Sequence, residues 1–178
     1  TNDVLYRSVV KRHLSLIPLS HDHHDILVVA QGLIVGQSRA PRSEWPPELN
    51  KQVHVVVAFF TETLRPHFEV EELVLFPLVR QRLPDRAELI RTLSSEHDQV
   101  RSLIWDLERN PARDLEERLP MLGKLLEGHV RSEERVLFQA VQRALGAADM
   151  ASLGEQLLLH RRRVSSCLLP GAARNRAD

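Results

Sequence analysis

The sequence contains a single cysteine, Cys167, among its 178 residues. This excludes an intrachain disulfide, and it excludes an iron–sulfur cluster held by this chain alone, because such clusters need several thiolates. An excess of either charge is also missing, since 24 Lys and Arg residues balance 24 Asp and Glu residues. Balanced charge predicts neither a nucleic acid nor a membrane as partner. The most basic run, His160 to Arg163, is typical of a solvated helix end.

Several patterns of other protein classes are absent as well. No apolar run approaches the roughly 20 residues that a membrane-spanning helix needs, and no charged-then-apolar leader opens the sequence. We therefore expect a soluble, cytoplasmic protein. No nucleophile–base pair, phosphate-binding glycine loop or dinucleotide fingerprint supports an enzyme with a defined organic substrate. At 43% hydrophobic content the chain can bury a core, and we predict one domain spanning residues 1–178.

Apolar residues recur at steps of three and four in four stretches, and no useful stretch alternates with the period of two that is typical of strands. Four long amphipathic helices with short connections predict an all-α fold, an antiparallel up-down-up-down four-helix bundle. We place its core at residues 19–146, with an N-terminal arm at 1–18 and a short C-terminal helix and tail at 147–178. The predicted buried stripes are Leu16, Leu19, His23, Ile26, Ala30 and Leu33; Leu49, Val53, Val56, Phe60, Leu64, His67, Glu71, Val74 and Leu78; Ile90, Leu93, His97, Val100, Ile104 and Leu107; and Leu119, Leu122, Leu126, His129, Glu133, Val136, Ala140 and Leu145.

Local signals predict where these helices begin and end. The first helix is expected to be capped by Ser20 or Asp22 and to reach about Ser38, followed by a proline-rich loop at 40–48. Pro66 should bend the second helix and remove a backbone hydrogen bond, and Pro77 should bend or end it. The third helix is expected between residues 84 and 110 and the fourth before Gly146. A fifth helix is expected at 150–160, and a disordered tail from residue 170.

One short pattern, H-x-x-x-E-E-x-x-L-F, occurs twice, as HFEVEELVLF from His67 and as HVRSEERVLF from His129. Four residues make slightly more than one helical turn, so each His points the same way as the Glu four positions later. Chance alone would give roughly 0.8 H-x-x-x-E pairs in a chain of this composition, so a single pair would mean little. Two copies that also agree at the following Glu, Leu and Phe indicate a pair of metal-binding clamps.

Six polar residues occupy positions on the apolar stripes where Leu or Val would be expected: His23, His67, Glu71, His97, His129 and Glu133. Buried without partners, they would cost several kcal/mol in lost hydrogen bonds to water. A lone histidine on such a stripe is most often bonded to a backbone carbonyl, but here each of the four helices contributes one. Four imidazoles and two carboxylates without thiolates suit one or two octahedral first-row metals, and two metals bridged by two carboxylates is the economical arrangement.

Neighbouring polar residues have weaker claims. His24 is a candidate for an additional ligand, and His21 is a weaker one. Glu72 and Glu134 are read as surface or supporting charges rather than ligands, and Asp22, Asp25 and Asp98 either orient the imidazoles or lie on solvated faces. We interpret three further histidines as structural: His13, His54 and His160.

The sequence resembles the hemerythrin-like (HHE cation-binding) family over roughly Leu19 to Gly146. The resemblance rests on LSHDHHDIL, HFEVEELVLFP, SSEHDQV and HVRSEERVLFQ. It implies a non-haem centre of two iron ions with an oxo or hydroxo bridge, in which Glu71 and Glu133 span the irons and the histidines are terminal ligands. Ferritin-type di-iron bundles instead place Glu before His at a spacing of three, so the order here argues against that group.

One departure from the family pattern affects the expected function. Oxygen-carrying hemerythrins have a second histidine on the third helix, where this chain has Leu93 and Arg101. Four histidines rather than five favour a sensor, scavenger or weak oxidase/peroxidase that handles O2, peroxide or nitric oxide. An iron-donating or iron-sensing module of the iron–sulfur repair type is the alternative, although its cysteine-bearing segment is missing. A helical interaction protein with a hydrogen-bonded polar core is a third possibility.

Overall fold

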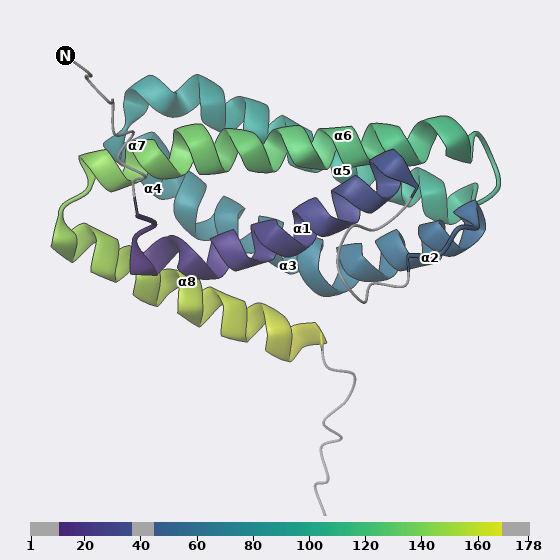
Figure 1. The fold of residues 1–178 in the computed structure, drawn as a ribbon. Helices are drawn as coiled ribbons and strands as arrows, with labels where there is room; N and C mark the ends of the chain where they lie inside the picture. Colours follow the sequence, from purple (N-terminus) through teal and green to yellow (C-terminus); the bar gives the residue numbers. More distant parts are fainter. Residues whose placement is uncertain (1–10, 37–44, 169–178) are drawn as a thin grey trace, which may run out of the picture.

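The computed structural model describes residues 11–36 and 45–168, with side chains described up to residue 162. All regular structure in these ranges is helical (Figure 1). The α-helices are α1 (Ile17–Val35), α2 (Leu49–Phe59), α3 (Arg65–Val70), α4 (Phe76–Arg82), α5 (Ala87–Arg109), α6 (Leu115–Ser132), α7 (Phe138–Ala144) and α8 (Ala147–Leu168). Short 3-10 segments are η1 (Leu14–Leu16) and η4 (Pro84–Arg86), and π-helical segments are η2 (Phe60–Leu64), η3 (Glu71–Leu75) and η5 (Glu133–Leu137).

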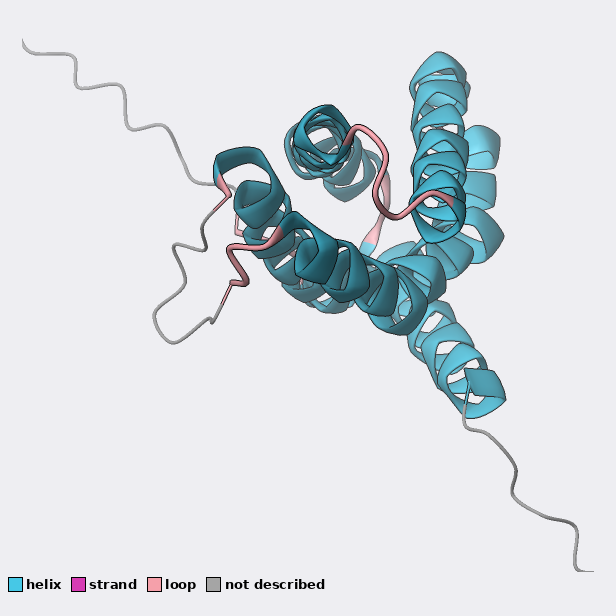
Figure 2. Cartoon of the chain, turned by 90° about the vertical axis from the view of Figure 1, so that its right-hand side faces the viewer, coloured by secondary structure: helices cyan, strands magenta, loops and turns pink. Residues whose placement is uncertain are grey.

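The elements assemble into a helical bundle. The segments α2 to α4 follow one another without a break, as do α6 to α7, so each forms one long helical stretch beside α1 and α5. Turned by 90°, the bundle is seen nearly end-on, with several helices viewed along their axes (Figure 2). Helices α1 and α6 pack closely because Gly123 has no side chain, and a Cβ there would lie 2.7 Å from the Ala30 carbonyl oxygen.

The hydrophobic core forms two clusters, and on α1 and on α5 the buried histidine lies between them. On α5, Leu93 belongs to one cluster, Val100 to the other, and His97 stands between. The same order holds for Leu19, His23 and Ile26 on α1. The buried side chains of both clusters thus enclose one polar layer, where apolar burial excludes water.

The start of α1 corrects the prediction of a cap at Ser20 or Asp22. The helix begins at Ile17, after η1, whose N-terminus is capped by the His13 ring accepting from the Ser15 N–H. Pro18 fits in the first turn because the N–H groups there have no helical partner. The helix ends at Val35, three residues earlier than expected, with Gly36 in the left-handed conformation at φ 70°.

Both prolines of the second helical stretch follow a π-helical segment. Before Pro66 the Arg65 N–H bonds to the Phe60 carbonyl, and before Pro77 the Phe76 N–H bonds to the Glu71 carbonyl. Of the two outcomes predicted for Pro77, a bend or an end of the helix, the end is wrong, because the helix continues past Pro77 to Arg82.

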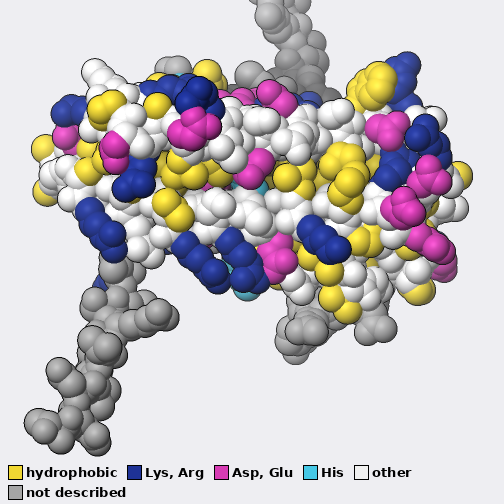
Figure 3. Space-filling model, turned by 90° about the horizontal axis from the view of Figure 1, so that it is seen from above, with side chains coloured by type: hydrophobic (Ala, Val, Ile, Leu, Met, Phe, Trp, Pro, Cys, Tyr) yellow, Lys and Arg dark blue, Asp and Glu magenta, His cyan; other side chains and the backbone are white. Residues whose placement is uncertain are grey.

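The third and fourth stretches begin and end close to the predicted positions, whereas α8 is longer than the predicted 150–160. Charges of both signs are spread over the face seen in Figure 3, as expected from the balanced composition. In the described part of the chain, none of the helices combines the length and apolar character needed to cross a bilayer. The predicted tail from residue 170 and most of the predicted arm lie outside the described residues.

Candidate metal centre

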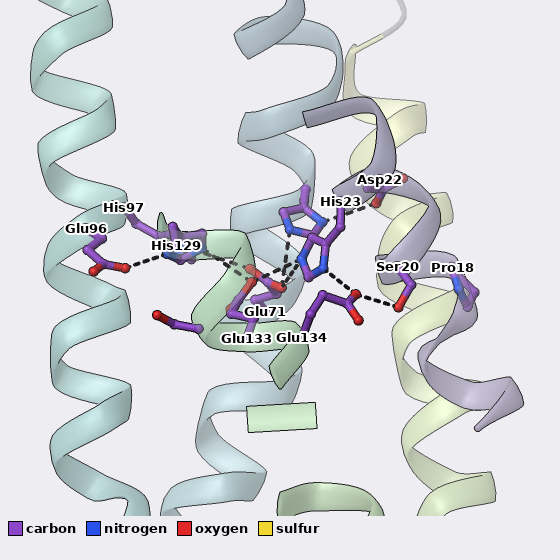
Figure 4. A network of polar contacts seen from close by, with 12 residues as sticks. Pro18, Ser20, Asp22, His23, Glu71, Glu96, His97, His129, Glu133 and Glu134 are labelled. Carbon is purple, nitrogen blue, oxygen red and sulfur yellow. Dashed lines mark hydrogen bonds and ion pairs between the residues drawn. The ribbon is translucent and has the colours of Figure 1, made fainter. Parts of the chain in front are cut away.

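The six polar residues of the stripes come together at the middle of the bundle, from α1, α3, η3, α5, α6 and η5 (Figure 4). Each is at most 2% exposed: His23, His67, Glu71, His97, His129 and Glu133. They form two groups in which one potential ligand atom per residue lies within 4.8 Å of the others. One group is His23, His67, Glu71 and Glu133, and the other is His97, His129, Glu71 and Glu133. The two carboxylates are therefore common to both groups.

A π-helical segment begins at each of the two shared glutamates. In η3 the Phe76 N–H bonds to the Glu71 carbonyl, and in η5 the Phe138 N–H bonds to the Glu133 carbonyl. A π-turn aligns residues five apart, so each glutamate and its phenylalanine face the same way. Phe76 stacks on His97 at 5.5 Å between ring centroids, and Phe138 stacks on His23 at 5.2 Å. Of these two segments η3 precedes a proline, Pro77, and η5 does not, so proline is not the common cause of the π-turns.

The four imidazoles present their Nε2 atoms to the two carboxylates. His23 Nε2 lies 3.0 Å from Glu133 Oε2 and 3.7 Å from Glu71 Oε1. His67 Nε2 is 3.3 Å from Glu71 Oε1, and His97 Nε2 is 3.4 Å from Glu71 Oε2. His129 Nε2 is 3.4 Å from Glu133 Oε2, the same i, i+4 relation as in the other copy.

Each Nδ1 atom faces outward and donates to a second carboxylate. His97 Nδ1 lies 2.7 Å from Glu72 Oε1 and His23 Nδ1 lies 2.7 Å from Glu134 Oε1. The other pairs are His129 Nδ1 with Glu96 Oε2 at 2.8 Å and His67 Nδ1 with Asp22 Oδ2 at 3.2 Å. This bond fixes both the orientation of the ring and the nitrogen that keeps its proton, so the Nε2 lone pair is directed inward.

The electrostatics of the metal-free cluster favour positive charge. Burial alone would lower the pKa of His129, but Glu133 and Glu96 outweigh it and raise the pKa to about 10. Burial would also lower the pKa of His23, but bonds to Glu133, Glu134 and Glu71 outweigh it and raise this pKa well above its usual value. The pKa of Glu134 is held at about 2, because bonds from His23 and Ser20 outweigh burial. The surrounding carboxylates thus keep protons on the imidazoles of the metal-free protein, and the same negative charge would stabilise a metal cation.

The donor set fits metal ions better than it fits a hydrogen-bonded polar core. The inward atoms His23 Nε2, His67 Nε2 and the carboxylate oxygens of Glu71 and Glu133 lie at ion-pair distances but make no hydrogen bond of good geometry. His97 Nε2 and His129 Nε2 face one another at 3.1 Å, although both rings donate from Nδ1. With the Nδ1 protons donated outward, inward nitrogens and carboxylate oxygens that face one another repel unless extra protons or a metal cation stand between them. Nitrogen and carboxylate donors without thiolate suit first-row metals.

The supporting residues were only partly foreseen from the sequence. Asp22, Glu72 and Glu134 do orient imidazoles, whereas Asp25 and Asp98 are exposed. Glu96 was missed. Its sequence signal was its place directly before His97, which matches Asp22 directly before His23.

The remaining histidines lie away from the cluster. His24 and His21 are exposed on α1, so the structure does not support either as a ligand. His54 and His160 each donate from Nδ1 to the backbone carbonyl one turn earlier, at 2.7 and 3.0 Å, in the structural role predicted for them.

The two positions that replace the second histidine of α5 have other roles. Leu93 is fully buried in the hydrophobic core. Arg101 turns its guanidinium to Glu72, with NH2 2.8 and 2.9 Å from the two carboxylate oxygens. Neither residue adds a donor atom to the cluster, because a guanidinium has no acceptor lone pair.

Comparison with known protein families identifies the relatives of this chain. Searches among curated proteins and among solved structures gave no significant match. Residues 17–141 match the family described as "Hemerythrin HHE cation binding domain". This range contains all six residues of the candidate metal centre and both copies of the repeated pattern. Since the match covers well over half of the chain, the chain belongs to the hemerythrin HHE cation-binding family.

Proposed function

We propose that this chain is a non-haem di-iron protein whose ligands are His23, His67, Glu71, His97, His129 and Glu133. Glu71 and Glu133 bridge the two irons, while the histidines bind in pairs. The observation that carries the proposal is the membership of both carboxylates in both four-residue groups, which a single metal ion would not need. The up-down-up-down order of the four helical stretches belongs to the same proposal, since it lets each stretch contribute to one central layer.

The proposed activity is the handling of O2, peroxide or nitric oxide, as a sensor, scavenger or weak oxidase/peroxidase. When bound, the irons would supply the redox chemistry and the open positions for such a ligand. The chain itself fixes the imidazoles through the outer carboxylates and excludes water with Phe68, Phe76 and Phe138, all fully buried. With four histidines available, two metal ions are not saturated by the protein.

The test is metal analysis of protein purified after expression in iron-replete medium, together with an optical spectrum. We expect two irons per chain and near-ultraviolet ligand-to-metal bands that change on adding peroxide or nitric oxide. Thermal unfolding before and after chelation gives a second readout, because a ligand at 1,000 times its Kd stabilises the folded state by about 4 kcal/mol. A colourless protein that unfolds identically with and without iron would contradict the proposal.

A second candidate function, in which iron is cargo or signal, is favoured by one observation. A cavity of about 180 Å³ reaches His67 and is lined mainly by polar residues: Asp22, Asp25, Glu62, Thr63, Pro66, His67 and Arg161. Carboxylates at such an opening would favour the passage of a cation. Rapid transfer of iron to a mild chelator, without spectral response to peroxide or nitric oxide, would support this function. Retention of iron for hours would contradict it.

A further inference from the structure

The centre has two corresponding halves, His23 with His67 and His97 with His129, and the outer carboxylates correspond between the halves as the inner residues do. Asp22 and Glu96 each precede a single histidine, and each accepts from the histidine of a repeated motif, His67 and His129 respectively. Glu72 and Glu134 each follow a shared glutamate and accept from His97 and His23. At the level of these four carboxylates, the outer layer therefore corresponds between the two halves as closely as the inner layer does.

The arginines that hold these carboxylates break the relation. Arg101 binds both oxygens of Glu72. Arg12 forms an ion pair with Glu134 and also donates to the Glu134 carbonyl at 3.1 Å. Arg161 binds Asp22 through both guanidinium NH2 groups, one of them 3.0 Å from Oδ1. Among the described residues, no ion pair with an arginine or lysine is found for Glu96.

The three arginines come from different parts of the chain. Arg101 lies within the matched family region of residues 17–141, whereas Arg12 precedes that region and Arg161, on α8, follows it. Both flanking arginines act on the same half of the centre, because Glu134 orients His23 and Asp22 orients His67. In the described part of the chain, the outer contacts of the half formed by His97 and His129 come from residues of the family region.

Further contacts tie the flanking segments to this half. The Arg12 guanidinium lies 4.9 Å from the centroid of the Phe138 ring. The same ring stacks on His23 at an interplanar angle of 16°. Arg161 also donates to the Pro18 carbonyl at 3.4 Å. Asp22 and Arg161 both line the cavity that reaches His67, so an Asp22 freed from Arg161 could turn into that space.

We propose that Arg12 and Arg161 are positioning residues for the metal ion held by His23 and His67. Through them, the docked N-terminal segment and α8 set how firmly this half holds its metal. The proposal rests on the proposed di-iron function. Its physical basis for Arg161 is that a two-pronged guanidinium fixes the plane of a carboxylate, and for Arg12 that one guanidinium nitrogen holds both the carboxylate and the carbonyl of Glu134. The fixed carboxylate then fixes the ring that donates to it. Lysine lacks the fork and would do this less well.

The test is the rate at which iron leaves the purified full chain for a chelator, measured for Arg12→Gln and Arg161→Gln. For each variant, one of the two irons is expected to leave about tenfold faster, the lower end of the effect of outer residues on metal affinity, and the other at the wild-type rate. Arg12→Lys and Arg161→Lys should give smaller increases. These lysine variants also keep the test available if a glutamine variant fails to fold.

Two matched controls separate positioning from docking. Arg82→Gln removes the 3.1 Å ion pair between α4 and Asp149 of α8 without touching the centre. Arg143→Gln removes an arginine of α7 that bonds to Gln139 of the same helix at 3.2 Å, while leaving Glu134 and Arg12 intact. Both variants should release iron at nearly the wild-type rate. Equal acceleration by the controls and the arginine variants would overturn the proposal.

The affected half is identified by combining Arg161→Gln with a ligand variant. In the background of His129→Gln, which leaves the His23/His67 half complete, Arg161→Gln should still accelerate iron release. In the background of His67→Gln it should have no effect on the remaining iron. If the wild type binds two irons and both arginine variants release them at the wild-type rate, the positioning proposal is overturned and the di-iron function is not. A wild type that binds no iron would overturn it together with the di-iron function.

Discussion

The two halves of the centre share their inner residues and differ in their outer ones. Each half has two buried histidines, and each uses Glu71 and Glu133. Each also has a phenylalanine stacked on its single histidine, Phe138 on His23 and Phe76 on His97. His97 differs from His23 in that Phe68 also stacks on it, at 3.7 Å between ring centroids. The main difference lies one layer further out, where, among the described residues, Arg12 and Arg161 support the first half and Arg101 the second. The repeated motif thus determines an equal inner set, and the flanking segments make the environment unequal.

This difference matters because the outer layer sets the properties of inner ligands. A carboxylate that is paired with arginine shares its negative charge and is held in one orientation, whereas an unpaired one is a stronger acceptor with more freedom. Asp22 and Glu96 represent these two cases at equivalent positions, with 14% and 20% of their side chains exposed. Two metal ions with equal ligands would therefore differ in how firmly they are held.

The largest effect is expected from the residues that both halves share. Changing Glu71→Gln and Glu133→Gln together keeps the shape of the side chains but removes the bridging charge, so both irons should be lost in metal analysis. The metal-free double variant should unfold below the wild-type temperature. Burial would raise the pKa of Glu71 and Glu133, but the surrounding imidazoles lower it, and the variant loses this stabilisation of the two carboxylates. Glu116→Gln with Glu117→Gln, on the exposed face of α6, is the matched control. Two irons retained in the Glu71/Glu133 variant would contradict the bridging role.

The next effect separates the halves. His67→Gln and His129→Gln remove equivalent ligands from the two motif copies, and each should lower the iron content from two per chain to about one. Iron analysis after gel filtration measures this directly. Complete loss of iron in both variants would show that neither half holds a metal by itself, and the two-half description would then be wrong.

A smaller effect is expected one layer out. Asp22→Asn and Glu96→Gln each weaken the bond that orients an imidazole, and each should lower the affinity for one iron by about tenfold, within the usual range for such residues. Competition with a chelator of known affinity is the measurement. Asp25→Asn, three residues from Asp22 on α1 and exposed, should leave the affinity unchanged. A fall of the same size in Asp25→Asn would point to a general charge effect instead.

The smallest effect is expected from a neighbour of a ligand. His24→Ala should not change the iron content, because the His24 side chain is exposed, whereas His23→Ala should remove iron from one half. Metal analysis of the two purified variants decides between them. Loss of iron in His24→Ala would restore His24 as a candidate ligand.

On the fourth helical stretch the buried stripe was predictable up to Glu133 and not beyond it, whereas the stripes of α1 and α5 were predictable throughout. Every predicted stripe position of α1 and α5 is buried, including the histidines. After Glu133 the regular stepping pointed to Val136 and Ala140, but Val136 is 43% exposed and the buried residues are Leu137 and Val141. The π-turn inserts one extra residue at this point, which moves every later side chain by one position. A stepping rule based on the α-helix cannot anticipate that shift.

The sequence by itself determined the helical character, the four histidines and two glutamates of the polar layer, and the family resemblance. The reason is that the i, i+4 spacing and the apolar period are local properties of the chain. A cytoplasmic location and a single domain stay predictions from composition and length. Only the tertiary structure decided that Glu96 supports His129, and that Arg12 and Arg161 reach the centre from outside the family region. These contacts join residues more than 30 positions apart, and the packing of different helices, rather than any spacing along one of them, brings the residues together.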